Sequence, residues 1–348
     1  MFRSRILTPL LLLLLQALMP PALAAGSPVG SGPIEDFSDA PVAREIIHPD
    51  WFRDDSFLNL SEDLQQALQG GKQGLVLYFG QANCAYCKQL MEVNFRDPEI
   101  VAYFRSHWDI IPLGIWGSRT VTLLDGEQLS ENALAIFEET QFTPSLIFYD
   151  AQGRQIYRMR GYYPPYRFMA LLRYLGEGFY RKERFSEYLQ RADPPPRFED
   201  DDLNEFDLAL PAPHILDRRV AAGQKPLLVL FEEPRCQACD QLHTRPLQDP
   251  GNRRLLQHFE IHQLDGRSDT PVITPEGRRL TAREWARQLG IHYYPTLVFF
   301  DERGREVFRI DSVAKLYRVR GVLAYVLDRG YEKYPTYQRW RRYAGFAR

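Results

Sequence analysis

Four cysteines stand in two pairs of identical spacing, Cys84-Ala-Tyr-Cys87 and Cys236-Gln-Ala-Cys239. Two residues three positions apart on a helix lie one turn apart, so the two sulfurs of a pair can reach one another. A cysteine at a helix N-terminus has a lowered pKa, because unpaired backbone N–H groups and the helix dipole stabilise its thiolate. We therefore predict that the first cysteine of each pair, Cys84 or Cys236, attacks a substrate disulfide. The second, Cys87 or Cys239, resolves the mixed disulfide, and the pair closes as a disulfide.

Other chemistries fit these pairs less well. Inert bridges would stabilise little, because closing so short a loop removes little entropy from the unfolded chain. Zinc sites place the second pair about 15–20 residues after the first, whereas these pairs are offset by 152 residues. A c-type haem needs a histidine directly after the second cysteine, where Lys88 and Asp240 stand. We expect no metal and no cofactor.

Copper is the alternative that stays open. Cys239 and His243 are four residues apart on one helical face, and soft ligands at this spacing could hold copper. A partly buried histidine on the inner face of the helix is the simpler interpretation.

The chain repeats itself once. Both cysteines of the first pair map onto the second pair with an offset of 152 residues, and from His107 onward the offset is 151, which maps Pro144 onto Pro295. A repeat unit of about 150 residues is a whole domain rather than one turn of a solenoid. The sequence therefore predicts two related domains.

Each repeat alternates strand and helix patterns. Short apolar runs rich in β-formers at 75–79 and 227–231 predict buried strands that end just before the cysteines. Helices are expected over 84–95 and 236–247, second strands at 110–115 and 261–264, and helices beginning at Ser130 and Thr281. Strands at 145–149 and 296–300 follow a proline and lead into hairpins, and a last helix closes each repeat. This order predicts an α/β fold with a mixed central sheet.

A CxxC pair between strand and helix, with a proline before the next-but-one strand, resembles the thioredoxin-like superfamily. The resemblance implies two tandem thioredoxin-fold domains, each a mixed central sheet flanked by helices. The first repeat is most similar to periplasmic thioredoxins of the SoxW type, in its Cys-Ala-Tyr-Cys-Lys88 site, its lead-in over 51–57 and its Ile115-Trp116-Gly117 stretch.

The resemblance also implies a second set of site residues. Cis bonds before Pro144 and Pro295 would turn the backbone of Thr143 and Tyr294 toward the cysteines. Their N–H and C=O groups could then pair with an extended substrate strand. We therefore expect Thr143, Pro144, Tyr294 and Pro295 to bind substrate.

Some features of the family are missing. Many thioredoxins carry a buried acid at the position of Tyr78 and Leu230, and neither residue can transfer a proton at neutral pH. Glu232 and Glu233 lie near Cys236 and could substitute for this acid, although exposed loop acids are the simpler interpretation. Neither CxxC contains a histidine. Lys88 favours a thiolate at the first site and Asp240 opposes one at the second, so we expect the first site to carry the more acidic thiol.

The ends and the middle of the chain set the predicted domain boundaries. Arg3 and Arg5 precede an apolar run over 6–19 and the small-residue stretch Ala22-Leu23-Ala24, which predicts a cleaved signal peptide over 1–24. We assign 40–192 to domain 1, 193–207 to a linker rich in proline and acidic residues, and 208–348 to domain 2. The aromatic and arginine-rich segment 331–348 is expected to be a packed terminal helix. The predicted location is the periplasm, where disulfides persist.

Composition narrows the function further. Lys plus Arg is 43 and Asp plus Glu is 45, a formal net charge of −2, which argues against nucleic acid as a partner. The sequence predicts a periplasmic thiol–disulfide oxidoreductase, working as a protein-disulfide reductase at one or both CxxC sites. Its expected partners are protein or small-molecule disulfides and a membrane electron donor, and the chain is expected to be a monomer. The alternative is a thioredoxin-like copper chaperone or substrate-binding module in which only domain 1 is redox-active.

Overall fold

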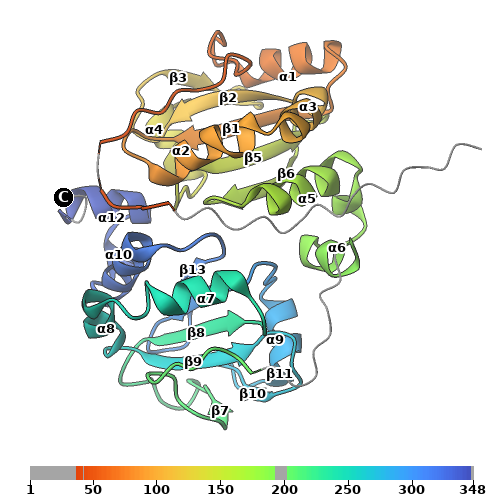
Figure 1. Cartoon of the computed structure of the whole chain (residues 1–348). Helices are drawn as coiled ribbons and strands as arrows, with labels where there is room; N and C mark the ends of the chain where they lie inside the picture. Colours follow the sequence, from red (N-terminus) through yellow and green to blue (C-terminus); the bar gives the residue numbers. More distant parts are fainter. Residues whose placement is uncertain (1–36, 42, 193–201, 346–348) are drawn as a thin grey trace, which may run out of the picture. The chain divides into compact units, whose positions relative to one another are not determined.

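Each repeat of the sequence builds its own four-stranded sheet (Figure 1). The computed structural model describes residues 37–41, 43–192 and 202–345. The predicted signal peptide, and residues 193–201 of the predicted linker, lie outside the described residues. In the first repeat the strand order is β2-β1-β5-β6, and in the second it is β13-β12-β8-β9. The two sheets therefore share one topology, with β8, β9, β12 and β13 corresponding to β1, β2, β5 and β6.

The elements of the first repeat are α1 (Leu60–Gln69), β1 (Gly74–Gly80), α2 (Ala85–Glu92), a 3-10 turn (Asn94–Arg96), α3 (Pro98–His107), β2 (Trp108–Gly114), β3 (Thr120–Thr122), β4 (Gln128–Ser130), α4 (Glu131–Phe137), β5 (Ser145–Asp150), β6 (Gln155–Arg160), α5 (Pro165–Gly176), a second 3-10 turn (Phe179–Arg181) and α6 (Phe185–Ala192). Those of the second are β7 (His214–Ile215), β8 (Leu227–Glu232), α7 (Gln237–Thr244), α8 (Pro250–Leu256), β9 (Glu260–Asp265), β10 (Pro271–Ile273), β11 (Arg279–Thr281), α9 (Ala282–Gln288), β12 (Thr296–Phe300), β13 (Glu306–Ile310), α10 (Leu316–Leu327), α11 (Gly330–Lys333) and α12 (Tyr337–Tyr343).

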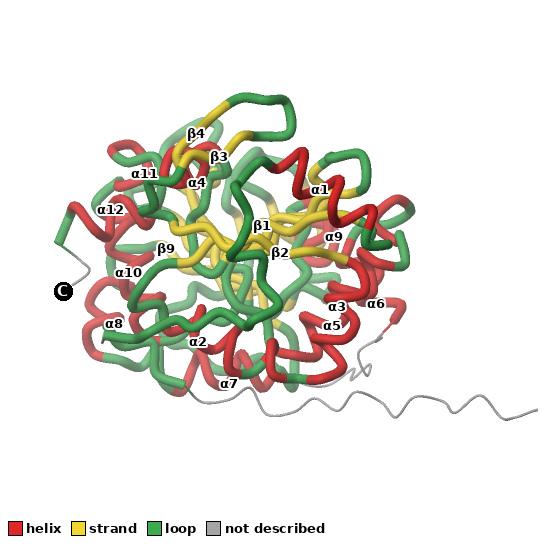
Figure 2. The backbone as a smooth tube through the Cα atoms, turned by 90° about the horizontal axis from the view of Figure 1, so that it is seen from above, coloured by secondary structure: helices red, strands yellow, loops and turns green. Residues whose placement is uncertain are grey.

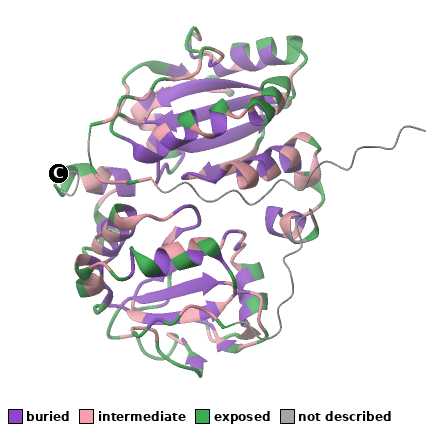
Figure 3. Cartoon of the chain, in the orientation of Figure 1, coloured by how far each residue is buried: buried purple, intermediate pink, exposed green. Residues whose placement is uncertain are grey.

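The strand before each cysteine pair lies in the middle of its sheet. β1 pairs in parallel with β2 and antiparallel with β5, and β8 makes the same two pairings with β9 and β12. Both central strands are buried along their whole length, as Figure 3 shows. The expected mixed sheet is confirmed. The short hairpin β3–β4 stands apart from the main sheet (Figure 2).

Helices cover both faces of each sheet. In the first repeat, α2, α3 and α5 pack on the face that carries Val76 and Tyr78, and α1 and α4 pack on the face that carries Leu75 and Leu77. Alternate side chains of β1 therefore pack into two separate hydrophobic cores, as the two-residue period of a strand requires. In the second repeat α7, α8 and α10 cover one face, and α9 covers the other.

Local capping explains where the helices begin. Asp97 and Asp249 cap α3 and α8 with their carboxylates, and a proline follows each of them at the first helical position. Ser130 caps α4, and Thr281 and Glu284 form the expected capping box at α9. The helix starts predicted at Ser130 and Thr281 are confirmed, whereas α3 and α8 were not predicted.

The second repeat departs from the first at its beginning. Between residues 202 and 226, which the structure describes throughout, no helix corresponds to α1, and β7 pairs in parallel with β10 instead. Phe206, which we assigned to the linker, is buried in the core of the second repeat against His243. The bond between Ala212 and Pro213 is a further cis peptide bond.

The two repeats share parts of their cores, and their described residues belong to one compact unit. The backbone N–H of Val313 donates to the carbonyl of Tyr162 (3.3 Å), its equivalent in the other repeat. Gly161 lies at this meeting point with a φ of +85°, and a Cβ there would collide with the Oγ of Ser312. In the described part of the chain, no helix is long and apolar enough to cross a membrane.

Candidate active site

The first cysteine of each pair caps the helix that carries the second. Cys84 has an extended backbone at the N-cap of α2, and its Sγ accepts a hydrogen bond from the N–H of Cys87 (3.0 Å). Cys236 caps α7 in the same way, with the N–H of Cys239 at 3.1 Å. Both pairs are closed as disulfides. In the reduced protein these N–H groups would stabilise a thiolate on the first sulfur.

The two cysteines of a pair differ in accessibility. Cys84 and Cys236 each keep 6% of their surface exposed, whereas Cys87 and Cys239 keep 1% or less. A substrate can therefore reach the first sulfur of a pair and not the second. This is the division of roles that the spacing predicts.

The two proline loops carry cis bonds at Thr143-Pro144 and Tyr294-Pro295. At the first site, the Oγ1 of Thr143 lies 3.3 Å from the Sγ of Cys84. A disulfide sulfur carries no hydrogen, so the Thr143 hydroxyl donates this bond. The same oxygen accepts a hydrogen bond from the Nε2 of Gln81 (2.8 Å).

Tyr294, the equivalent of Thr143, makes a different contact. Arg267 lies over its ring at 5.5 Å and forms an ion pair with Glu233. Burial raises the pKa of the Tyr294 phenol, which keeps it neutral. In the first repeat, the residues equivalent to Arg267 and Glu233 are Trp116 and Gln81, which are hydrogen-bonded (2.9 Å). The two sites therefore differ most in the charge around the proline loop.

A buried acid lies under the second site, where the simpler of the two sequence interpretations was wrong. Glu232 is the last residue of β8 and is fully buried, not an exposed loop acid. Its carboxylate lies 2.8 Å from the Nε2 of His243 and accepts a hydrogen bond from the Nε2 of Gln263 (2.6 Å). Since His243 is on α7, one turn after Cys239, the acid is connected to the cysteine helix.

The first site has no such acid. Gly80 and Met91 replace Glu232 and His243, and the buried residue under this site is Tyr78, whose pKa is raised by burial. As for metals, no three His, Cys, Asp or Glu side chains come together as a possible metal site within the described ranges.

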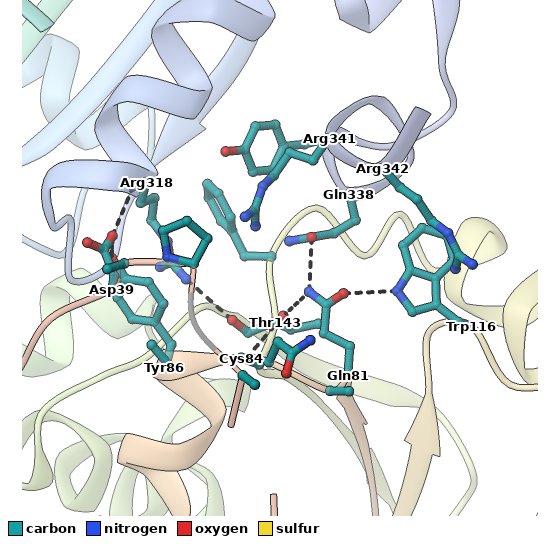
Figure 4. A pocket seen from close by; sticks show the side chains of 18 residues that line it. Asp39, Gln81, Cys84, Tyr86, Trp116, Thr143, Arg318, Gln338, Arg341 and Arg342 are labelled. Atoms are coloured by element: carbon teal, nitrogen blue, oxygen red, sulfur yellow. Dashed lines mark hydrogen bonds between the residues drawn. The ribbon is translucent and has the colours of Figure 1, made fainter. Parts of the chain in front are cut away.

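Residues of the second repeat complete the first site, which no pattern in the sequence predicted. A cavity of about 470 Å³ opens beside Cys84 and Thr143 (Figure 4). Its opposite wall comes from α10 and α12, which contribute Arg318, Arg341 and Arg342. The sequence predicted a packed helix here, and Tyr337 and Trp340 of α12 are indeed buried. That its arginines lie beside a cysteine some 250 residues earlier depends on the packing of the two repeats.

The family comparison detects the two repeats of the chain separately. The family model described as a thioredoxin-like domain matches the chain twice, over residues 60–176 and 217–327. No curated protein matches the chain. Among solved structures, a thioredoxin-fold protein from Helicobacter pylori is 25% identical over 41% of this chain and 87% of its own, with a TM-score of 0.33. A thioredoxin from Thermus thermophilus is 21% identical over 34% of this chain and 83% of its own, with a TM-score of 0.27. An alkylhydroperoxide reductase from Enterococcus faecalis is 13% identical over 77% of this chain and 100% of its own, with a TM-score of 0.25.

Proposed function

Because the chain belongs to the thioredoxin-like domain family in both repeats and carries a disulfide-forming CxxC pair in each, we propose that it is a thiol–disulfide oxidoreductase that works as a disulfide reductase. The tandem arrangement expected from the sequence is confirmed. The likeness of the first repeat to SoxW-type proteins stays a prediction.

The surroundings of the Cys84 sulfur are the main support for this proposal. The Sγ of Cys84 accepts the N–H of Cys87, lies beside the Thr143 hydroxyl and borders a cavity, while Cys87 is fully buried behind it. Disulfide exchange needs a nucleophilic thiolate that is stabilised and accessible to the substrate. It also needs a resolving thiol that the substrate does not reach, and the pair has this arrangement.

The reaction balances without a cofactor. The Cys84 thiolate attacks one sulfur of the substrate disulfide, forms a mixed disulfide and releases one substrate thiolate. The Cys87 thiolate then attacks the Sγ of Cys84, breaks the mixed disulfide and releases the second thiolate. Two electrons pass to the substrate, and the two cysteine protons go to the two released thiolates. A dithiol donor must then reduce the Cys84–Cys87 disulfide again.

The reductive direction rests on the sequence of the two sites. In strong oxidants, a histidine between the two cysteines helps to stabilise the thiolate. Neither pair of this chain has such a histidine. The test is the reduction potential of each pair, measured in glutathione buffers on the protein, the Cys84→Ser/Cys87→Ser variant and the Cys236→Ser/Cys239→Ser variant. Potentials near about −270 mV support a reductase, and potentials near about −120 mV overturn that direction.

The same two variants test which repeat works. If reduction of a substrate disulfide survives the loss of Cys236 and Cys239 but not the loss of Cys84 and Cys87, only the first repeat is catalytic. If each variant keeps part of the activity and the two parts add up to that of the unmodified protein, the two sites act independently. If all three proteins fail to reduce any disulfide, the proposed function is wrong.

The proposed location is the periplasm, with a membrane protein as the electron donor. It is supported by the signal-like pattern over 1–24. The measurement is the N-terminal sequence of the protein recovered from the periplasmic fraction. A start close to residue 25 supports export, whereas an intact Met1 in the cytoplasmic fraction contradicts it.

A further inference from the structure

In the wall of the cavity beside Cys84, the backbone of the proline loop is already hydrogen-bonded to the second repeat. The Nη2 of Arg318 donates to the carbonyl oxygen of Thr143 at 3.3 Å, and this carbonyl is one of the groups that we expected to pair with substrate. On Gln141, two residues before Thr143, the carbonyl accepts the Nε2 of Gln338 (3.2 Å) and the side chain accepts the N–H of Tyr337 (2.8 Å). The edge of the proline loop is therefore already paired with the second repeat, and a substrate strand would have to displace these bonds.

The part of the loop that stays open is the side chain of Thr143 beside the sulfur. A volume of about 470 Å³ suits a ligand of a few tens of heavy atoms rather than a folded substrate. Cys84 lies on the floor of this cavity, Gln81 and Trp116 lie on the side of Arg342 from α12, and Tyr86 lies on the opposite side (Figure 4).

The charge of the cavity is positive. Arg318, Arg341 and Arg342 line it, and Asp39 is the carboxylate on its wall. Asp39 is already engaged, because it accepts hydrogen bonds from the backbone N–H of Arg318 (2.9 Å) and from the phenol of Tyr86 (2.8 Å). No carboxylate within the described ranges forms an ion pair with Arg341 or Arg342.

The arginines are held in place by aromatic rings and by burial. The guanidinium of Arg342 lies 4.3 Å over Trp116, and that of Arg318 lies 3.4 Å over Tyr86 and is buried. Burial lowers the pKa of Arg318, and Tyr86 and Asp39 oppose this effect. The charges of Arg341 and Arg342 would attract an anion into the cavity.

We propose that the Cys84 site takes small disulfides that carry carboxylates, held by Arg341 and Arg342 while the Thr143 hydroxyl and Cys84 meet the disulfide. This inference rests on the proposed function and names its substrate class at the first site. The exchange is the one written above: the Cys84–Cys87 dithiol is oxidised by two electrons, the small disulfide is reduced to two thiols, and a dithiol donor restores the site.

The experiment compares three small disulfides that differ in charge. The probes are 3,3′-dithiodipropionate (a dianion), bis(2-hydroxyethyl) disulfide (neutral) and cystamine (a dication). The Cys236→Ser/Cys239→Ser protein is reduced, freed of reductant and mixed with an excess of each probe. Oxidation of the remaining pair is followed by acid quench, alkylation and intact mass. Each rate constant is divided by that of the same probe with dithiothreitol, an uncharged dithiol, which removes intrinsic reactivity.

We expect the corrected rate to be about tenfold higher for the dianion than for the neutral probe, and lowest for the dication. Added salt should reduce the advantage of the dianion, because it screens the arginines. The Arg341→Gln/Arg342→Gln variant should lower the corrected rate of the dianion much more than that of the neutral probe, and so lose most of this advantage. Arg303→Gln, an exposed arginine outside the cavity lining, is the matched control and should behave like the parent.

Equal corrected rates for the three probes would overturn the inference and leave the proposed function intact, since the pair would still react. A protein disulfide such as that of insulin that reacts faster than the dianion would also overturn it, because the covered proline loop would then be open. If the protein oxidises with none of the probes and not with insulin, the proposed function itself fails. The salt series uses no arginine variant, so the inference is testable even if the double variant does not fold.

Discussion

Phe142 and Tyr293 stand at the same position of their two repeats, and each is buried in the core of the other repeat. Phe142 packs edge-on against Phe308 (5.4 Å) and Tyr337 (5.5 Å) of the second repeat. Tyr293 stacks on Tyr163 of the first (6.2 Å). Both residues lie two positions before the cis-proline of a candidate site, so the proline loops of the two sites also hold the repeats together.

The packing of each side chain in the core of the other repeat predicts how two substitutions change stability. Phe142→Ala and Tyr293→Ala should each lower the free energy of unfolding by about 3 kcal/mol, because each removes a buried ring and leaves a cavity. Phe137→Ala is the control, since Phe137 is 66% exposed and should change the free energy by less than about 0.5 kcal/mol. Urea unfolding measures all three. If Phe142→Ala costs no more than Phe137→Ala, Phe142 does not hold the repeats together.

His292 predicts a pH dependence of the contact between the repeats. Its Nε2 accepts the hydroxyl of Tyr163 (2.8 Å), and its Nδ1 donates to the carbonyl of Gly290 (3.0 Å), so the neutral ring satisfies both bonds. Burial lowers the pKa of His292 below 6.5, with Arg167 and Arg309 adding to the effect and Asp311 opposing it. The unfolded chain therefore takes up this proton before the folded chain does.

The expected result is a loss of stability on the acid side. The free energy of unfolding should fall as the pH drops through about 6.5 toward the lower pKa of the folded state, and should not depend on His292 above that range. His292→Gln keeps a hydrogen-bonding side chain but cannot take up the proton, so its stability should fall less steeply between pH 7 and pH 5. Exposed His258→Gln is the control. If the curves of unfolding free energy against pH are parallel for His292→Gln and the parent protein, His292 does not cause the acid sensitivity. The other histidines contribute equally to both curves, so their effect cancels in the comparison.

Local signals were sufficient for the elements that carry the cysteines. The short apolar runs, the Ser and Thr caps and the glycine turns act within a few residues, so β1, α2 and their counterparts could be predicted from the sequence. Glu232 was misjudged because it follows a run of five apolar residues and precedes another glutamate, which looks like the start of a loop. The signal that could have found it is long-range: His243 and Gln263 come from a helix and a strand that meet only in the fold.

The cavity could not be predicted for the same reason. Arg318 bonds to Thr143 across 175 residues of sequence. No periodicity or spacing in either segment encodes that contact. It follows from how two complete domains pack, which depends on many weak contacts at once.

The polar group under the second site predicts coupled effects on stability. Glu232→Leu leaves buried His243 without its acceptor, removes one of the two acceptors of Gln263, and should cost about 3 kcal/mol of unfolding free energy. Glu232→Leu/His243→Met resembles the first repeat, which has Met91 at this place, and should cost less than the sum of the two single changes. A double-mutant cycle in urea measures the coupling, with exposed Asp240→Asn as the control. Additive costs would mean that the carboxylate and the imidazole do not depend on one another.

Thr143 predicts a change in the reactivity of Cys84 that depends on pH. In the reduced protein, the Thr143 hydroxyl is placed to donate to the Cys84 thiolate, as it does to the sulfur of the disulfide. Thr143→Val keeps the shape of the side chain and removes the donor. A hydrogen bond to a charged group contributes about 1.5 kcal/mol, so the midpoint of the alkylation profile should move about one pH unit higher.

The two ends of that profile should respond in opposite directions. Below the midpoint the valine variant forms less thiolate and should react more slowly. Above it both proteins are fully ionised, and the less stabilised thiolate is the better nucleophile, by about threefold for a Brønsted coefficient of about 0.5. The measurement is the rate of iodoacetamide alkylation against pH in a protein whose only cysteine is Cys84. Thr143→Ser should restore the parent profile, because it restores the hydroxyl. Valine and parent profiles that coincide at every pH would show that Thr143 positions the proline loop without touching the chemistry of Cys84.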